Sequence, residues 1–342
     1  MLLPDADRFL YSYIRKEAVL SSQIEGTQSS LSDLLLFEHN VAPGVPIGDV
    51  RETANYIVAM NHGIARMSEG FPLSLRLIRE IHGLLLRDVR GGEAAPGEFR
   101  KTQNWIGGSR PGNARFVPPP AHEVLPAMGD LEKFLHDEPT QTPILVKAAL
   151  AHAQFETIHP FLDGNGRVGR LLITLLLCAE PQVLARPLLY LSLYLKSHRD
   201  EYYGHLQSIR TEGAWEEWLR FFLTGVIEVA SSATTTTGAI VHLVEEDRRA
   251  IQERLGRAAG TAARVHELAV KDMAITIPET ARALSLSDVT VANSTGLLED
   301  LGILKEITGK PRGKLFVYLR YLALLDEGID AFDTPVMAIK CS

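Results

Sequence analysis

Apolar residues recur at steps of three and four along most of the chain, which is the spacing of one face of an α-helix. The alternation of apolar and polar residues that is typical of strands is almost absent before residue 300. The pattern therefore predicts a mainly α fold. It places helices at residues 9–25, 32–37, 49–67, 74–86, 124–136, 144–158, 165–178, 199–208 and 215–229.

Between residues 89 and 120 the helical pattern stops. Glycine and proline pairs punctuate short extended pieces there, and a loop of this length inside a compact domain is typically functional or mobile. Residues 103–106 could pair with residues 114–117 as a hairpin. A serine and threonine tract at residues 231–237 is a candidate linker, although a helix that runs through it is also compatible with the sequence.

The C-terminal part of the chain shows a different order of elements. A short helix near residues 278–284, a turn and a helix over residues 289–301 precede two extended pieces, 304–307 and 315–319. The segment between the two pieces is basic, and helix, turn, helix and basic-tipped hairpin form the layout of a winged helix. We therefore divide the chain into an N-terminal helical region over 1–70, a central domain over 71–230, a helical linker over 231–262, a winged-helix domain over 263–325 and a tail over 326–342.

Composition excludes several classes of protein. The 342 residues suffice for about two domains, and 46% hydrophobic with 23% charged residues is typical of a globular chain. The formal net charge of −7 disfavours a mainly electrostatic nucleic-acid binder. Only Cys178 and Cys341 are present, which excludes a disulfide framework and a four-cysteine zinc site. No apolar run suits a signal peptide or a membrane span, so we expect a reduced, cytoplasmic protein.

One stretch, from His159 to Arg170, carries candidate chemistry. It reads His-Pro-Phe-Leu-Asp-Gly-Asn-Gly-Arg-Val-Gly-Arg, and its second half opens the expected helix 165–178. The first N–H groups of a helix are unpaired and carry a partial positive charge, so they can hold phosphates. Gly164 and Gly166 would let a ligand approach the backbone closely. The stretch therefore predicts a phosphate site at a helix N-terminus.

Charged side chains accompany this turn. Arg167 and Arg170 are three residues apart and would both face bound phosphates. Asp163, just ahead of the helix, is placed to ligate a magnesium ion that bridges phosphate oxygens. His159 is the only plausible general base nearby, since the ordinary pKa of histidine lies close to neutrality.

Other interpretations of these glycines are weaker. Gly164-x-Gly166-x-x-Gly169 matches the dinucleotide-binding pattern, but that pattern needs a preceding strand, and the preceding residues read as a helix. The P-loop pattern is absent from the sequence. A glycine-rich turn with merely solvated arginines is the plain alternative, which we reject because His, Asp, Asn, Gly and Arg converge within twelve positions.

The twelve residues resemble the signature of Fic-domain proteins: His-Pro-Phe, any residue, an acid, Gly-Asn-Gly-Arg, two further residues and Arg. Every specified position is matched. Residues 72–82, the turn at residues 97–100 and residues 116–120 are also similar to the flap and flanking helices of that family, so the resemblance covers roughly residues 70–225. It implies a Fic-type helical bundle with a β-hairpin flap, followed here by the small winged-helix domain.

The resemblance implies an activity, namely transfer of AMP from ATP to a Ser, Thr or Tyr hydroxyl of a target protein or of the chain itself. His159 would be the base and Asp163 the Mg²⁺ ligand. The cradle for the phosphates would be Gly164, Asn165 and Gly166, with the β- and γ-phosphates held by Arg167 and Arg170.

Two further features are assigned through the same resemblance. The hairpin near residues 102–106 would be the flap that aligns an extended target segment by strand addition. Tyr202 and Tyr203 are similar to the aromatic pair that lines the adenine pocket in the family. Packing of this pair against Trp215 or Trp218 is the alternative.

A second motif, Ser21-Ser22-Gln23-Ile24-Glu25-Gly26, is similar to the inhibitory pattern of the family. Ser21 and Glu25 are four residues apart and lie on one helical face, and Gly26 suits a left-handed C-cap. Alone, the motif would read as a surface glutamate at a helix end. Beside a complete Fic signature, we expect Glu25 to pair with Arg170, to withdraw it from the γ-phosphate and to leave the enzyme weakly active.

Two rival functions stay open. The same site could remove AMP from a modified protein, with Glu25 positioning a water molecule. Alternatively, the chain could be a nucleotide-sensing regulator that binds DNA through its winged helix. The second helix of that domain, residues 288–300, has three acids and no Lys or Arg, so only Lys310, Arg312 and Lys314 could contact a DNA backbone. A module for protein contact or homodimer formation is the interpretation that we favour.

Overall fold

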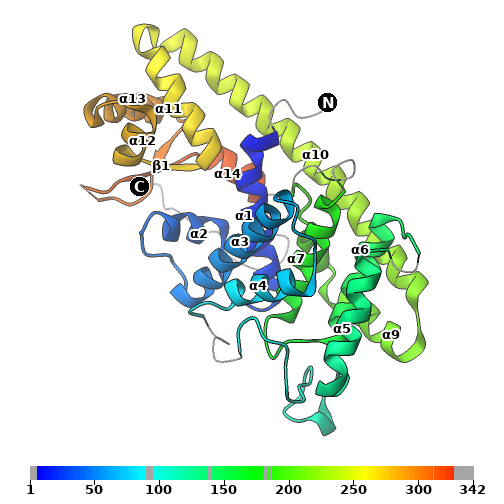
Figure 1. Cartoon of the computed structure of the whole chain (residues 1–342). Coiled ribbons are helices and arrows are strands. Elements are labelled where there is room, and N and C mark those ends of the chain that lie inside the picture. The colour runs from blue at the N-terminus through cyan, green and yellow to red at the C-terminus, as the bar shows by residue number, and fades with distance from the viewer. Residues whose placement is uncertain are drawn as a thin grey trace. The chain divides into compact units, whose positions relative to one another are not determined.

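The computed structural model describes residues 6–89, 95–137, 140–180, 184, 187–310 and 312–326, and it is mainly helical (Figure 1). In the first part of the chain the helices are α1 (Ala6–Ile24), α2 (Leu31–Glu38), α3 (Ile47–Ser68), α4 (Leu75–Leu85), α5 (Ala121–Leu135), α6 (Ile144–Ile158), α7 (Asn165–Cys178), α8 (Ser192–Ser197), α9 (Arg199–Glu212) and α10 (Trp215–Arg254). They are followed by α11 (Ala259–Asp272), β1 (Ala274–Thr276), α12 (Ile277–Leu284), α13 (Asp288–Asp300), β2 (Lys305–Glu306), β3 (Leu315–Val317) and α14 (Leu319–Asp326).

These elements form two compact units. Unit 1 takes its described residues from Met1–Lys16, Leu35–Ala42 and Ser231–Ser342, and unit 2 takes its own from Glu17–Leu34 and Pro43–Ala230. Helices α1 and α10 therefore each contribute residues to both units. The division of the chain at residues 70, 230, 262 and 325 stays a prediction.

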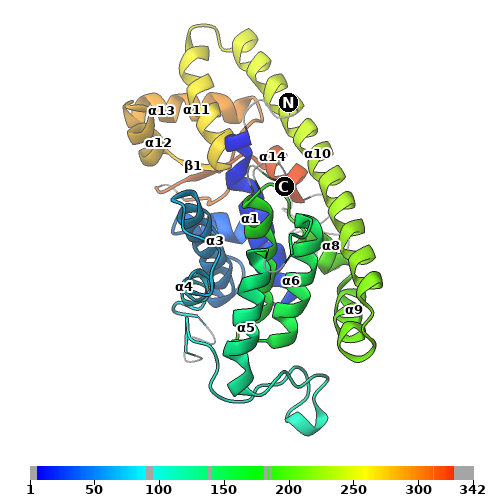
Figure 2. The same ribbon diagram turned by 45° about the vertical axis from the view of Figure 1, so that its right-hand side comes forward.

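In unit 2, α7 is the central helix. Every residue from Arg167 to Leu177 is buried, and a helix that is apolar on nearly all sides belongs in the middle of a bundle. Helices α3, α4 and α6 pack around it (Figures 1 and 2). The N-terminus of α7 therefore opens inside the bundle, and the loop that joins α6 to α7 is held among these helices.

Most helices lie where the hydrophobic pattern predicted them, and the bounds of α6 and α7 agree to the residue. Helix α10 is the main difference, because it continues through the serine and threonine tract without a break. Thr237 is buried, and its hydroxyl contacts both the Ala233 carbonyl, at 2.7 Å, and the Tyr13 hydroxyl, at 2.5 Å. Of the two interpretations of residues 231–237 that the sequence left open, the structure has the continuous helix, in which threonine hydroxyls find partners.

The C-terminal part of unit 1 contains the helix, turn, helix and strand pair that the sequence predicted. The sheet has the order β1-β3-β2, with antiparallel pairs that include Ala274 opposite Val317 and Lys305 opposite Val317. Strand β1 and helices α11 and α14 were not expected, and β1 is only three residues long. The assignment of this part as a winged helix stays a prediction, and the tail over 326–342 lies almost wholly outside the described residues.

The expected hairpin between α4 and α5 is reduced to one antiparallel bridge. Ile106 N–H donates to the Phe116 carbonyl at 2.9 Å, and Arg115 N–H donates to the Ile106 carbonyl at 2.9 Å. The glycines and the short 3₁₀ turn Pro111–Asn113 shape the tip of this segment, which we call the flap (residues 102–117).

None of the helices in the part of the chain that the structure describes combines the length and the apolar character needed to cross a membrane.

Candidate active site

His159 ends α6 and begins the loop that leads to α7. Its backbone is left-handed, with φ +49° and ψ +61°, a conformation that non-glycine residues seldom adopt and that is enriched at functional sites. Arg100 holds this conformation, since its Nε donates to the His159 carbonyl at 2.9 Å and its N–H donates to the Pro160 carbonyl at 2.9 Å. Asn104 adds a bond from Nδ2 to the Phe161 carbonyl at 2.9 Å. The start of the flap thus fixes the loop.

His82, on α4, holds the same loop from the other side. Its ring stacks on Phe161 with 3.7 Å between centroids, Nδ1 accepts the Gly97 N–H at 2.8 Å, and Nε2 lies 3.0 Å from the Asp163 carbonyl. Because Nδ1 accepts a hydrogen bond from the Gly97 N–H, Nε2 must carry the ring hydrogen of the neutral imidazole. Burial lowers the pKa of His82 to about 4, which keeps this neutral tautomer at physiological pH.

The N-terminus of α7 is shaped by Gly164, which has φ +76°. The Asn165 side chain turns back into the loop, where Oδ1 accepts the Phe161 N–H at 2.9 Å and Nδ2 donates to the Phe161 carbonyl at 2.8 Å. The Asn165 side chain therefore holds the loop, and its place in a phosphate cradle with Gly164 and Gly166 stays a prediction.

Arg170 lies at the bottom of this turn and is fully buried. Its Nη2 is 2.6 Å from Glu25 Oε1, Nε donates to the Ser21 hydroxyl at 2.9 Å, and Nη2 also donates to the Ser21 carbonyl at 2.9 Å. A Cβ on Gly166 would lie 2.1 Å from Glu25 Oε1. The Glu25 carboxylate therefore sits against the first turn of α7, at the position where a helix favours an anion. Gly26 follows with φ +95°, in the expected left-handed region.

Arg167 has a different partner from the one expected. Its Nη1 is 3.0 Å from Glu52 Oε2 on α3, and both side chains are almost fully buried. The sequence predicted that Arg167 and Arg170 would both face phosphates. In the structure each arginine is paired with an acid, Arg167 with Glu52 and Arg170 with Glu25, and their contact with phosphates stays a prediction.

The charges at the site are set by burial and by close partners. Burial opposes the ionisation of Glu25, but Arg170 outweighs this effect and holds the pKa of Glu25 below its ordinary value. Burial likewise opposes the charge of Arg170, and Glu25 outweighs it, so the pKa of Arg170 is raised. Burial, with the positive charge of Arg210, lowers the pKa of His159 to about 4. His159 is therefore neutral at pH 7, the form that a general base requires.

Asp163 was expected to ligate magnesium. Its Oδ1 accepts the Gly164 N–H at 2.6 Å, and its side chain is 48% exposed at the mouth of the turn. Within the described ranges, no group of three or more His, Cys, Asp and Glu side chains could hold a metal ion. A single exposed carboxylate beside a phosphate site nevertheless fits Mg²⁺, which is commonly bound by one or two carboxylates together with substrate phosphates and water.

The tyrosine pair divides between the two interpretations that the sequence left open. Tyr202 is fully buried, lies 2.8 Å through its hydroxyl from His152 Nε2, and packs 6.2 Å from the Trp218 ring. This burial favours packing and leaves no open face for an adenine. Tyr203 is half-buried, with the Arg199 guanidinium 5.4 Å from its ring centroid.

Sequence reasoning missed several residues that shape the site. Arg100 and His82 stood in the stretches that resemble the family, but their bonds to the loop required the fold. Glu52 gave no signal, since a glutamate within a helix is normally solvated. Glu156, on the last turn of α6, and Arg210, on α9, also face the loop, and Arg210 Nη2 donates to the Glu156 carbonyl at 2.9 Å.

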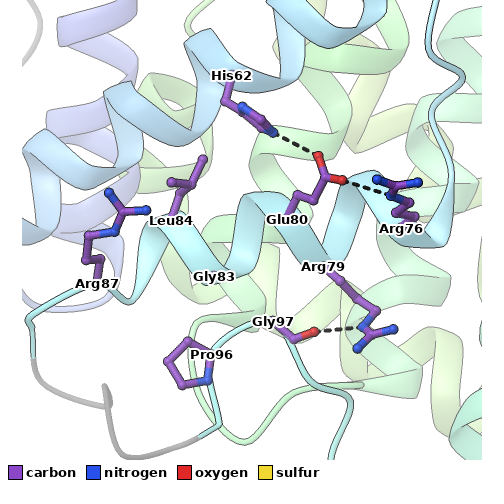
Figure 3. A pocket seen from close by; sticks show the side chains of 9 residues that line it. All are labelled: His62, Arg76, Arg79, Glu80, Gly83, Leu84, Arg87, Pro96 and Gly97. Carbon is purple, nitrogen blue, oxygen red and sulfur yellow. Dashed lines mark hydrogen bonds and ion pairs between the residues drawn. The ribbon is translucent and has the colours of Figure 1, made fainter.

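A pocket of about 710 Å³ opens on the side of α4 and is shown in Figure 3. Arg79 spans it, with Nε donating to the Gly97 carbonyl at 2.7 Å and Nη2 paired with Glu98. Glu80 is paired with Arg76 and His62, at 3.0 Å each. One of its lining residues, Gly97, contacts the site, because its N–H donates to His82 Nδ1.

Two family profiles match the chain. The one described as Fic/DOC family matches residues 72–177, and the one described as Fic/DOC family N-terminal matches residues 1–65. The Protein adenylyltransferase Fic of Drosophila grimshawi is 32% identical over 202 residues, which are 58% of this chain and 38% of that protein. The protein of the same name from Culex quinquefasciatus is 31% identical over 258 residues, which are 71% of this chain and 47% of that protein. The chain therefore spans less than half the length of these relatives.

Solved structures agree in fold. A Fic family protein from Desulfovibrio desulfuricans G20 has a TM-score of 0.57 at 21% identity, over 90% of this chain and 87% of that one. A Fic domain containing signaling protein from Bacteroides thetaiotaomicron VPI-5482 has a TM-score of 0.54 at 21% identity, over 69% and 91%. These similarities confirm the mainly helical Fic fold. Residues 1–65 and 72–177 thus match the two parts of the Fic/DOC family, and the fold is that of Fic proteins.

Proposed function

We propose that this chain is an autoinhibited protein adenylyltransferase, which transfers AMP from ATP to a Ser, Thr or Tyr hydroxyl of a protein. The names of the relatives that are 31–32% identical support the reaction. The observation that carries the proposal is the Glu25 carboxylate, which lies against Arg170 and Gly166 at the first turn of α7. A helix N-terminus that already holds one anion is suited to the phosphates of a nucleotide.

In this proposal His159 is the general base. Its neutral imidazole takes the proton of the acceptor hydroxyl, the oxygen attacks the α-phosphate in line, and pyrophosphate leaves. The N–H groups of Gly164, Asn165 and Gly166 hold the phosphates in place, so the protein supplies mainly position and charge stabilisation. Asp163 would hold Mg²⁺, which when bound neutralises charge on the phosphate oxygens.

Arg170 is the point of inhibition in the proposal. While Glu25 occupies it, the guanidinium is withheld from the γ-phosphate, and the carboxylate repels an incoming phosphate at the same turn. The Glu25 side chain is 34% exposed, so it can leave the turn without unfolding the helices around it. Displacement of Glu25 would then activate the site.

The test is mass spectrometry of the Glu25→Gly chain incubated with ATP and Mg²⁺. An added AMP on a hydroxyl side chain is expected, together with a much smaller amount on the unchanged chain and none on the Glu25→Gly, His159→Ala double variant. Absence of nucleotide binding by calorimetry, in both the unchanged chain and the Glu25→Gly variant, would contradict the proposal. Loss of AMP from a previously modified chain in the same assay would favour AMP removal as the activity.

A further inference from the structure

Glu156 lies three residues before His159, on the last turn of α6. Its Oε2 is 3.8 Å from His159 Nδ1, and its side chain is only 7% exposed. The Nδ1 atom is itself buried, so Nε2 is the ring nitrogen that remains for a substrate. The two side chains therefore face each other on the buried side of the loop.

The carboxyl of Glu156 is unusual in having little to hold it. Among the described residues, Oε1 has no hydrogen-bond partner although it is buried, and most buried polar atoms in proteins do have one. Burial raises the pKa of Glu156 to about 7, against the opposing charge of Arg170. A buried carboxyl oxygen without a hydrogen-bond partner calls for an explanation.

The absence of a side chain at Gly169, on helix α7, makes space for the Glu156 carboxyl. A Cβ at that position would lie 2.6 Å from Glu156 Oε1 and 3.2 Å from His152 Nδ1. Glycine within a helix is less stable than alanine, so its presence here is explained by the space that Glu156 requires. Gly169 and Glu156 thus form one packing unit behind His159.

Charged and titratable groups surround Glu156 on every side. Arg170 on α7, Arg210 on α9 and Glu25 after α1 all act on its charge. The other neighbours are Tyr202 on α9 and His152 on α6, which stays neutral because burial lowers its pKa to about 3. When Glu25 pairs with Arg170, it offsets the positive charge of that arginine. Release of Glu25 therefore lowers the pKa of Glu156, because Arg170 lowers this pKa and Glu25 raises it.

We propose that Glu156 is a positioning residue for the transfer reaction, whose carboxylate orients Nδ1 of His159 and balances the charge that the imidazole gains. This inference rests on the proposed function. The hydroxyl O–H bond breaks as its proton moves to Nε2, the oxygen bonds to the α-phosphorus, and the bond to pyrophosphate breaks with its electron pair. The imidazolium formed in this step is stabilised by the charge of the adjacent carboxylate, whose Oε2 lies 3.8 Å from Nδ1, beyond hydrogen-bond distance.

The experiment compares Glu25→Gly with Glu25→Gly, Glu156→Gln. Automodification at saturating ATP and Mg²⁺ is measured by mass spectrometry from pH 5.5 to 8.5. In the parent, the rate should rise with pH as Glu156 ionises. The rise should lie below the pH at which Glu156 ionises in the unchanged chain, because Glu25 raises the pKa of Glu156 and Arg170 lowers it. The Gln variant should be slower by about tenfold or more, within the range that acid–base groups contribute, and should lose this rise. Glu156→Asp should restore part of both.

A second readout does not depend on activity. Histidine resonances are followed by NMR against pH in the full chain, with His159 assigned from the His159→Ala spectrum. The His159 signal should shift near pH 7 in the unchanged chain and not in Glu156→Gln. Glu17→Gln is the matched control, because burial also raises the pKa of Glu17 to about 7, and this control should keep the shift.

The outcomes are distinguishable. An unchanged rate profile and an unchanged His159 titration in Glu156→Gln overturn the inference while leaving the transferase intact. A coupled titration without any AMP transfer keeps the pairing of Glu156 with His159 and overturns the catalytic part of both proposals. Circular dichroism of each variant shows whether it is folded. If Glu156→Gln is unfolded, the inference is supported by a folded Glu156→Asp variant whose rate of automodification still rises with pH, and it is overturned if that rate does not rise.

Discussion

The first two turns of α7 carry two arginines, Arg167 and Arg170, and their surroundings differ. Arg167 pairs with Glu52 at 3.0 Å, and both side chains are more than nine-tenths buried. Arg170 pairs with Glu25 at 2.6 Å, but the Glu25 side chain is 34% exposed. Glu52 lies within α3, in its second turn, whereas Glu25 follows the last residue of α1 and precedes a glycine. Both side chains of the Arg167–Glu52 pair are buried, which we call the enclosed pair, whereas in the Arg170–Glu25 pair the acid is partly exposed to solvent, which we call the open pair.

This difference separates a structural ion pair from one that can be released. A fully buried acid cannot leave its partner without exposing an unpaired charge inside the protein. An acid at the end of a helix can turn toward water, while its arginine keeps the Ser21 hydroxyl and carbonyl. The position of the acid, more than that of the arginine, therefore decides which pair can act as a switch.

The largest expected effect is on stability. Glu52→Gln should lower the free energy of unfolding by up to about 3–5 kcal/mol, because it leaves the buried Arg167 with only the half-exposed Asp163, 4.0 Å away, as an acid partner. Glu25→Gln should cost less, because Arg170 retains its bonds to Ser21. Urea unfolding of both variants measures the contrast, and equal losses would remove the distinction between the enclosed and the open pair.

The next effect is on the rate of AMP transfer. Glu25→Gly should raise automodification about 10- to 100-fold, since a hydrogen bond to a charged group contributes about 1.5–3 kcal/mol and each 1.4 kcal/mol is tenfold. Glu52→Gln should give no such rise, although it also removes an acid from an arginine. Quantitative mass spectrometry of labelled chain compares them, and activation of both variants would show that any loosening of the turn suffices.

A smaller effect is expected at the serines. Ser21→Ala removes the hydroxyl that accepts a hydrogen bond from Arg170 Nε. One such bond contributes about 1 kcal/mol, so Arg170 should be released more easily and automodification should rise several-fold. Ser22→Ala is the matched control, because the Ser22 hydroxyl is buried with no hydrogen-bond partner among the described residues. The same assay compares the two, and an equal response would assign no role to the Ser21 hydroxyl.

The smallest effect concerns pH and the helix that carries Glu25. Burial raises the pKa of Glu17 on α1 to about 7, so the folded chain binds a proton there that the unfolded chain has lost above about pH 4.5. This contribution to stability therefore decreases as pH rises through 7. The Glu17→Gln variant should lack this pH dependence. Its free energy of unfolding, relative to that of the unchanged chain, should therefore increase by about 1 kcal/mol from pH 6 to pH 8. Thermal unfolding at both pH values tests this, and a constant difference would contradict it.

The hydrophobic pattern predicted the helices of unit 2 well, because each buries one continuous face. The bounds of α6 and α7 agree with the expectation, and Pro143 and the turn at Gly164 mark where these helices begin. The pattern left residues 231–237 open between a linker and a continuous helix, and the structure has the helix. It missed β1, where three residues are too few for a period.

The sequence by itself determined the family, the chemistry-bearing loop and the residues at the mouth of α7, because these depend on neighbours along the chain. The contact between Glu25 and Arg170 could be expected from two motifs, and it is present in the structure. Only the tertiary structure assigned Arg167 to Glu52, turned Asn165 inward and placed Glu156 behind His159. Ion pairs and burial join residues far apart in the chain, and local spacing carries no information about such partners.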